Sequence, residues 1–197
     1  MIIIGLTGGT GAGKTTALYA LRELGACIID CDRVYHDLLE HSAPMKREME
    51  GRFPSAFQGG TFQRKKLGEL VFNDSQALEE LGKITHKYVA MEVEDQISAA
   101  GREGAVAVAV DAIALIESGL GEKCDVVVGV VAPAEKRVSR IVKREGIAEE
   151  YAVTRVNGQK PEEFFRENCD YILENNSDDI EAFKQECKDL FARMIGD

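Results

Sequence analysis

The chain has 197 residues, of which 45% are hydrophobic and 29% charged, a length and composition that predict one globular domain with an apolar core. Its net charge of −10 disfavours a nucleic-acid partner, because binding to a phosphate backbone needs a broad basic surface. No apolar run is long enough to span a membrane, and the apolar start after Met1 is short and lacks the basic residues of a signal peptide. We therefore expect a cytoplasmic protein without a membrane partner.

The cysteines follow neither the pattern of a metal site nor that of a disulfide framework. No C-x-x-C pair occurs, no histidine pair has the spacing of zinc ligands, and the number of cysteines is odd. We expect reduced and mostly buried thiols at Cys27, Cys31, Cys124, Cys169 and Cys187.

The N-terminal segment predicts a strand, a helix and a second strand. Residues 2–6 form a short apolar run, and residues 14–24 place leucines at helical spacing before Gly25. Residues 26–30, ACIID, have the pattern of the second strand. Such a unit pairs its strands in parallel, so we expect a parallel sheet.

The region that follows predicts helices without a regular pattern. Residues 33–102 contain breaks at Pro44, Pro54 and the Gly59-Gly60 pair. We expect this region to be a helical excursion from the sheet.

The second half of the chain predicts three more strands. Residues 105–110 and 125–131 are nearly continuous apolar runs, which are typical of strands covered on both faces. A charged helix follows Pro133, a short strand is expected at residues 169–173, and an amphipathic helix at residues 179–195. The whole pattern predicts a three-layer α/β fold with two helical excursions.

The clearest motif lies between the first strand and the first helix. Residues 8–15, GGTGAGKT, fit the pattern G-x-x-x-x-G-K-[ST]. Glycines allow successive backbone N–H groups to point at phosphate oxygens, and the following helix adds the positive end of its dipole. We expect Lys14 to reach the β- and γ-phosphates of a nucleoside triphosphate and Thr15 to bind Mg²⁺. The alternative is a glycine-rich turn without a ligand.

The motifs that would indicate a GTPase are missing from the sequence. After the strand at 105–110 the chain continues Asp111-Ala-Ile-Ala, without the glycine of Asp-x-x-Gly. After the last strand it continues Glu174-Asn-Asn-Ser, which is not the guanine-reading Asn-Lys-x-Asp. A small kinase remains, and such an enzyme needs a lid that excludes water.

Acidic residues follow two of the predicted strands. Asp30 and Asp32 come at the end of the second strand, where residues two apart share a face and ligands bind in open α/β sheets. Either carboxylate could orient the hydroxyl that attacks the phosphoryl group, or could merely cap the next helix. Asp111 ends the central strand, where a carboxylate can hold Mg²⁺ or cap a turn.

A row of arginines follows Pro133. Arg137, Arg140 and Arg144 have the spacing of one helix face. Guanidinium groups bind phosphate in a bidentate manner, so the row could neutralise charge that develops during phosphoryl transfer. The alternative is a solvated helix face.

Two segments around the expected phosphate site resemble the dephospho-coenzyme A kinase family. Residues 5–16, GLTGGTGAGKTT, are very close to the opening of that family. Residues 24–32, LGACIIDCD, resemble its LG-x-x-x-IDAD segment, whose second Asp is regarded as the catalytic base. The resemblance therefore implies this role for Asp32.

Further segments resemble the same family in the same order along the chain. Residues 60–67, GTFQRKKL, are similar to G-x-L-D-R-x-x-L, and residues 81–86, LGKITH, to LN-x-I-x-HP. Residues 111–117 resemble D-x-PLL-x-E. These three segments imply that Arg64, His86 and Leu115 contact the acceptor.

The C-terminal part completes the resemblance. Arg140 and Arg144 match the lid arginines of the family, residues 155–159 match R-x-x-x-Q, and residues 169–175 match AD-x-V-I-x-N. The implied nucleotide-binding residues are Gly9, Thr10, Gly11, Ala12, Gly13, Lys14, Thr15, Thr16, Arg144 and Asn175. The implied catalytic residues are Asp32, Lys14 and Arg140, and the implied metal ligands are Thr15 and Asp111.

The resemblance covers nearly the whole chain and implies both a fold and a reaction. It implies a P-loop kinase core with five parallel strands at about 1–32, 104–135 and 165–197, a helical coenzyme A-binding lobe at about 33–103, and a lid at about 136–164. The implied reaction is the ATP-dependent, Mg²⁺-assisted phosphorylation of the ribose 3′-hydroxyl of dephospho-coenzyme A, the last step of coenzyme A synthesis. We expect a monomer or weak homo-oligomer.

Three positions depart from the family's pattern on the acceptor side. Gln63 stands where the family has Asp, and Lys87 and Ile113 stand where it has Pro. The alternatives are therefore a related kinase for another nucleoside, nucleotide or small alcohol, and a non-catalytic nucleotide-binding module.

Overall fold

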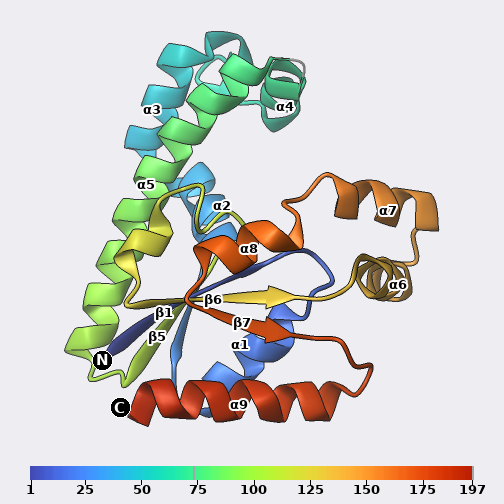
Figure 1. Ribbon diagram of the computed structural model, residues 1–197. Helices are drawn as coiled ribbons and strands as arrows, with labels where there is room; N and C mark the ends of the chain where they lie inside the picture. The colour runs from blue at the N-terminus through green and yellow to red at the C-terminus, as the bar shows by residue number, and fades with distance from the viewer. Residues whose placement is uncertain (73, 197) are drawn as a thin grey trace. The chain divides into compact units, whose positions relative to one another are not determined.

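The computed structural model describes residues 1–72 and 74–196. The chain divides into two compact units, one formed by Met1–Asp30 with Ile97–Asp197 and the other by Cys31–Gln96. Figure 1 labels the helices and strands. Each unit has a buried core of its own.

The first unit is built on a sheet of five parallel strands, as predicted. The strand order is β2-β5-β1-β6-β7. Every neighbouring pair is parallel. The strands are β1 (Ile2–Gly8), β2 (Cys27–Asp30), β5 (Ala107–Asp111), β6 (Val126–Val131) and β7 (Tyr171–Glu174).

Helices cover both faces of this sheet (Figure 1). On one face α1 (Lys14–Glu23) packs against α9 (Ile180–Gly196). On the other, α8 (Glu162–Asn168) contacts β6 and β7. Ile4 of β1 and Phe191 of α9 are fully buried in the core that results. This confirms the α/β fold with helices on either side of a parallel sheet.

A helical pair extends from the core between β6 and α8. It consists of α6 (Ala134–Glu145) and α7 (Glu149–Asn157), and Pro133 precedes α6 as predicted. Ile141 and Ala152, both fully buried, join the two helices in a small apolar cluster. The predicted lid, residues 136–164, covers α7, all but the first two residues of α6, and the start of α8.

The second unit is mainly helical. Its helices are α2 (Cys31–His41), α3 (Ala43–Arg52), α4 (Arg64–Phe72) and most of α5 (Ser75–Arg102). Met45 and Met49 of α3 are fully buried in its core. The short 3-10 helices of the chain are η1 (Pro54–Ala56) here and η2 (Leu120–Lys123) in the first unit.

The predicted breaks at Pro44 and at the Gly59-Gly60 pair are confirmed, since the first lies at the boundary of α2 and α3 and the second lies between α3 and α4. Pro44 lies in the first turn of α3, where its missing N–H needs no partner, and Ser42 caps the helix by accepting a hydrogen bond from the Met45 N–H at 3.3 Å. The Gly59-Gly60 pair forms the turn of a hairpin between β3 (Phe57–Gln58) and β4 (Thr61–Phe62), which the sequence pattern missed because each strand has only two residues.

The prediction of mostly buried thiols is wrong for Cys27, which is exposed at the start of the edge strand β2. Cys31 and Cys187 are buried, and Cys124 and Cys169 are partly buried. Burial raises the pKa of Cys124 and Cys187 to about 12 and that of Cys169 to about 11.

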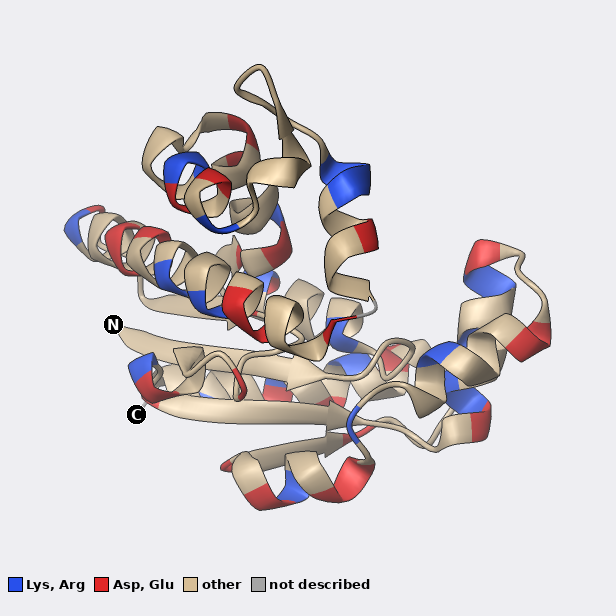
Figure 2. Ribbon diagram, turned by 90° about the horizontal axis from the view of Figure 1, so that it is seen from above, with Lys and Arg blue, Asp and Glu red and all other residues tan. Residues whose placement is uncertain are grey.

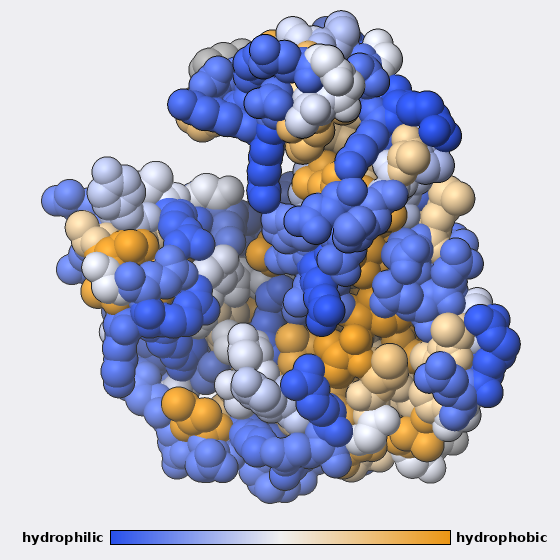
Figure 3. All heavy atoms as spheres, turned by 180° about the vertical axis from the view of Figure 1, so that it is seen from behind, coloured by the Kyte–Doolittle hydropathy of each residue, from blue (hydrophilic) through white to orange (hydrophobic). Residues whose placement is uncertain are grey.

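The surface is charged and mixed in sign. Figure 2 shows Lys and Arg interleaved with Asp and Glu on the helices, while the strands are largely uncharged. On the face drawn in Figure 3, hydrophilic residues cover most of the surface and apolar ones appear in patches between them. In the part of the chain that is described, no helix has both the length and the apolar character to span a bilayer.

Candidate nucleotide-binding site

The glycine-rich loop lies where the sequence predicted it, between the end of β1 and the start of α1. Gly8 has a φ of 141°, and a Cβ there would lie 2.3 Å from the backbone oxygen of Val130 on the neighbouring strand. Gly13 precedes α1 with a φ of 117°, and a Cβ there would lie 2.3 Å from Asn175 Nδ2. Both positions therefore require glycine.

The start of α1 is suited to an anion. Its first turn, which is described in full, contains no Asp or Glu, so the positive end of the helix dipole is not offset there. Thr15 is exposed in this turn, and the Thr16 N–H donates to Gly13 O at 3.0 Å.

Lys14 forms an ion pair with Asp111. Its Nζ lies 2.9 Å from Asp111 Oδ1, and the two side chains are only 15% and 17% exposed. Asp111 ends β5 beside β1, and Asp30 of β2 is its register partner on the other side. Neighbouring parallel strands point paired residues to the same face, so Asp30 and Asp111 share a face at the carboxyl end of the sheet.

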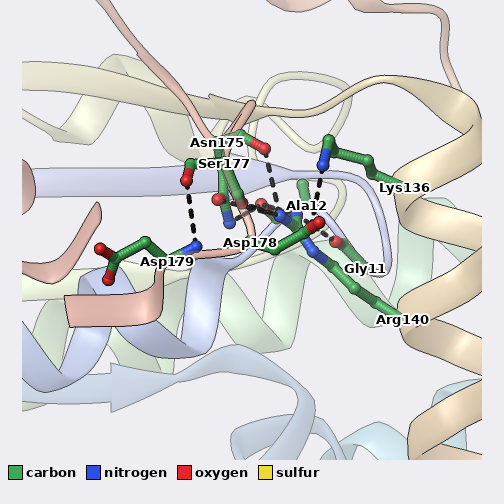
Figure 4. Close-up of polar contacts among 8 residues, drawn as sticks. All are labelled: Gly11, Ala12, Lys136, Arg140, Asn175, Ser177, Asp178 and Asp179. Atoms are coloured by element: carbon green, nitrogen blue, oxygen red, sulfur yellow. Dashed lines mark hydrogen bonds and ion pairs between the residues drawn. The ribbon is translucent and has the colours of Figure 1, made fainter. Parts of the chain in front are cut away.

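Arg140 of α6 holds the outer side of the loop. Its guanidinium donates to the backbone oxygens of Gly11 at 3.3 Å and Ala12 at 3.5 Å. It also donates to the backbone oxygens of Asn175 at 3.2 Å and Ser177 at 2.7 Å, and to Asn175 Oδ1 at 3.0 Å. Figure 4 shows the guanidinium between the loop and the segment after β7. This arginine is therefore fixed by many acceptors at once.

Asn175 binds the same stretch of loop from the end of β7. Its side-chain amide is buried and donates to Ala12 O at 2.9 Å, while its backbone N–H donates to Val131 O at 2.8 Å. Lys136 extends this region by pairing with Asp178 at 2.9 Å (Figure 4). The sequence predicted that Asn175 contacts the nucleotide, and in the structure its side chain binds the backbone of the loop.

Two more side chains bind the loop at Thr10: Arg137, for which the sequence predicted only the phosphate-binding role shared by the arginine row, and Gln159, for which it predicted none. Arg137 was only one member of the arginine row, and Gln159 was only the last letter of R-x-x-x-Q. The signal that could have singled out Arg137 is its place in the first turn of α6, directly after a strand whose carboxyl end faces the loop. Burial lowers the pKa of Arg137, and the carboxylate of Glu162 acts in the opposite direction.

Arg144 does not share the surroundings of Arg140. One turn further along α6, it is exposed and pairs with Glu145 at 2.6 Å. Glu145 also pairs with Arg155 of α7. Hydrogen bonds from Arg144 and Arg155 lower the pKa of Glu145. The row of three arginines therefore divides into two that hold the loop and one that pairs with Glu145 of its own helix.

Three of the predicted acceptor residues lie in the second unit. Asp32 is exposed in the first turn of α2, so the expectation that it shares a strand face with Asp30 is wrong: β2 ends at Asp30 and the helix begins one residue later. Arg64 is exposed at the start of α4, and His86 is partly buried on α5. Burial raises the pKa of Tyr35, and the positive charge of Arg64 opposes this shift.

Leu115 belongs to the first unit and is fully buried. A Cβ added at Gly5 would lie 2.7 Å from Leu115 Cδ2, so this side chain packs directly against β1. This position favours packing over contact with an acceptor.

Comparison with known proteins agrees with this arrangement. The family model described as "Dephospho-CoA kinase" matches residues 2–181. The dephospho-CoA kinase of Syntrophotalea carbinolica is 30% identical, over 99% of this chain and 93% of the relative. That of Corynebacterium jeikeium is 35% identical, over 89% of this chain and 91% of the relative.

Solved structures give the same result. A structure from Thermus thermophilus is 32% identical with a TM-score of 0.79, covering 98% of this chain and 97% of that one. The dephospho-CoA kinase of Campylobacter jejuni is 26% identical with a TM-score of 0.71 and the same coverage. A shikimate kinase of Bacteroides thetaiotaomicron, 17% identical with a TM-score of 0.51, shares the fold. By sequence and by structure, the chain belongs to the dephospho-CoA kinase family.

Proposed function

We propose that the chain transfers the γ-phosphoryl group of ATP to the ribose 3′-hydroxyl of dephospho-coenzyme A. Membership of the family supports the reaction. The observation that carries the proposal is the loop between β1 and α1, after which Lys14 begins α1, a helix whose own first turn has no acidic residue to offset its dipole. That is the arrangement a triphosphate needs.

On the nucleotide side, Lys14 would exchange partners. In the structure its Nζ binds Asp111, and a triphosphate, which carries more negative charge than one carboxylate, would draw Nζ to its β- and γ-phosphates. The Arg140 guanidinium, which binds backbone oxygens of the loop, would add positive charge there. This charge would offset the negative charge that develops on the phosphoryl group during transfer. We propose that the Arg144 guanidinium gives up its ion pair with Glu145 and binds the nucleotide instead.

Mg²⁺ would be held by Thr15 and Asp111. The ion pair with Lys14 indicates that Asp111 faces a cation at this edge of the sheet, and both residues offer the oxygen ligands that Mg²⁺ prefers. When bound, the ion neutralises charge on the phosphates and helps to align them. The chain's own part is to present one hydroxyl and one carboxylate to it.

On the acceptor side, we propose that Asp32 orients the ribose hydroxyl and accepts its proton late in the transfer. Its place in the first turn of α2 leaves its carboxylate exposed and available. Asp30 is the competing candidate, because it is the register partner of Asp111. Arg64 and His86 would contact the acceptor, and the same role for Leu115 stays a prediction.

The residues at the positions that depart from the family's pattern make the following contacts in this chain. Lys87 pairs with Glu48, whose carboxylate also accepts from Tyr88 Oη at 2.8 Å. The backbone oxygen of Ile113 accepts from Thr7 Oγ1 at 3.0 Å. The backbone N–H of Gln63 donates to Ala56 O at 2.8 Å. The Ile113 and Gln63 bonds are made by the backbone and do not depend on the side chain, so the identity of the acceptor is a question for the assay below.

A coupled ADP-release assay tests the proposal. ADP should form rapidly with dephospho-coenzyme A and slowly with adenosine, AMP or pantetheine derivatives, and mass spectrometry should identify coenzyme A. The Lys14→Ala chain and a reaction without acceptor serve as controls for contamination and hydrolysis. Faster turnover with another acceptor would show that this other compound is the substrate. Nucleotide binding without any transfer would indicate a non-catalytic binding module. The predictions of a cytoplasmic location and of a monomer or weak homo-oligomer stay predictions.

A further inference from the structure

Every polar group of Thr10 is bound by two side chains from outside the loop. Its N–H donates to Gln159 Oε1 at 2.9 Å, and its Oγ1 accepts from Gln159 Nε2 at 2.8 Å. Its carbonyl oxygen accepts from Arg137 Nε at 3.0 Å. Arg137 Nη2 also donates to Gln159 Oε1, so the two side chains are joined to each other. We call this arrangement the Thr10 clasp.

The clasp fixes the backbone of the loop and not only a side chain. The peptide planes on either side of Thr10 each have a bound atom, the N–H before it and the C=O after it, so its φ and ψ are both restrained. Thr10 is a central residue of a turn in which the Ala12 N–H donates to Gly9 O at 3.1 Å. The directions of the N–H groups that follow depend on this turn.

The glycines of the loop leave space for the clasp. A Cβ on Gly9 would lie 2.2 Å from Arg137 Nη2 and 2.9 Å from Gln159 Oε1. A Cβ on Gly11 would lie 2.7 Å from the backbone oxygen of Arg137. Arg137 is only 8% exposed, so its guanidinium is packed against the loop and has little room to move. The loop and the clasp are thus fitted to each other.

The two side chains of the clasp come from the two ends of the α6–α7 pair. Arg137 lies in the first turn of α6, and Gln159 lies just after α7, before α8 begins. The chain between them, residues 138–158, therefore leaves the core and returns to it at the same loop residue. A displacement of either end would be transmitted to Thr10.

We propose that Gln159 and Arg137 are positioning residues that hold the loop at Thr10 in the conformation that binds nucleotide phosphates. Without the clasp, ATP would have to order this turn as it binds, which costs conformational entropy. The proposal rests on the nucleotide site of the proposed function but not on the identity of the acceptor. It concerns affinity for ATP, not the chemistry of transfer.

The test is calorimetric titration of the Gln159→Ala chain with Mg-ATP in the absence of acceptor. The Kd should rise about tenfold, the equivalent of about one net hydrogen bond, because the lost contacts order the loop before ATP binds. Turnover at saturating ATP should stay within about twofold of the unmodified chain, since ATP then orders the turn. The matched control is Gln185→Ala on α9, where the exposed glutamine bonds only its own helix neighbour Asp189 among the contacts described.

A second variant keeps the test independent of folding defects. Arg137→Lys retains the charge but cannot donate to both Thr10 O and Gln159 Oε1 in the same way, so it should also weaken ATP binding. The double variant should lose little more than the worse single one, because the clasp acts as one unit. Melting temperatures of all variants report loss of fold separately.

The possible outcomes distinguish the positioning role from the proposed function. An unchanged Kd in Gln159→Ala, additive losses in the double variant, or a large loss of turnover at saturating ATP with normal affinity would each overturn the positioning role. An unmodified chain that binds ATP but does not phosphorylate dephospho-coenzyme A would contradict only the proposed acceptor. An unmodified chain that does not bind ATP would overturn both proposals.

Discussion

Lys14 and Asp111 lie 97 residues apart in the chain, yet their side chains meet at 2.9 Å. The contact joins the first residue of α1 to the last residue of β5. The lysine is thus held beside the carboxylate that we propose for Mg²⁺. Its ammonium group needs only to change acceptors when the triphosphate enters.

We expect Lys14→Ala to lower turnover by at least about 10²-fold, because the charge that stabilises the transferring phosphoryl group is lost. The free energy of unfolding should fall by about 1–3 kcal/mol, since the pair with Asp111 is largely buried. Steady-state assays and chemical denaturation measure the two effects. Lys83→Ala, which removes an exposed pair with Glu79, is the control and should leave both turnover and the free energy of unfolding nearly unchanged. Normal turnover of Lys14→Ala would remove the phosphate site from this loop.

Asp32→Asn should reduce turnover by about 10²–10⁴-fold while leaving the Kd for ATP nearly unchanged, because it removes the proton acceptor and keeps the shape. Asp30→Asn should have a smaller effect on turnover. Both carboxylates are exposed, so melting temperatures should change little in either variant. Binding and turnover are measured on the same samples. If Asp30→Asn is the inactive variant and Asp32→Asn is active, the two roles are reversed.

Arg140→Ala and Arg144→Ala should behave differently in stability. Arg140 is bound to the loop and to the segment after β7, so its loss should lower the melting temperature by several degrees as well as turnover. Arg144 is exposed and bound to Glu145, so its loss should reduce turnover with little change in melting temperature. Thermal unfolding and initial rates distinguish the two. Equal melting temperatures would contradict the holding role of Arg140.

Cys27 should react with iodoacetamide at pH 8 far faster than the other thiols described. It is exposed, whereas burial keeps the pKa of Cys124 and Cys187 at about 12 and that of Cys169 at about 11. At pH 8 a thiol with a pKa of 12 is ionised in only about one molecule in 10⁴, and the thiolate is the reactive form. Peptide mass spectrometry over time gives the order of labelling. Cys27→Ser is the control and should abolish the fast phase.

Much of the candidate nucleotide-binding site could be predicted from the sequence, because its main features are encoded by residues close together in the chain. The loop at 8–15 needs specific residue types at fixed spacing, and the strands around it are apolar runs. The five-stranded parallel sheet is confirmed with small shifts, such as β5 beginning at Ala107 where the apolar run begins at 105.

The predictions that were wrong or incomplete concern residues whose surroundings are set by contacts between segments distant in the sequence. Asp32 was expected to share a strand face with Asp30 because the two residues are two apart at the end of the predicted strand, but the backbone turns into α2 directly after Asp30. The arginine row could be seen as one helix face, yet only the packing of α6 against the loop separates Arg140 from Arg144. The role of Gln159 needed the path of the whole chain, which no local pattern contains.

Gly8 bears on how the motif itself is interpreted. Its Cβ would collide with Val130 O, an atom of the neighbouring strand and not of any ligand. The demand for glycine at this position thus comes from the sheet and persists whether or not a nucleotide is ever bound. A descendant of this chain that lost catalysis would remain under pressure to keep Gly8, whereas Lys14 would be kept only for its ion pair with Asp111 and no longer for phosphate binding. A relative that keeps Gly8 but has another residue in place of Lys14 would therefore be identified as a protein that retains the fold without catalysis.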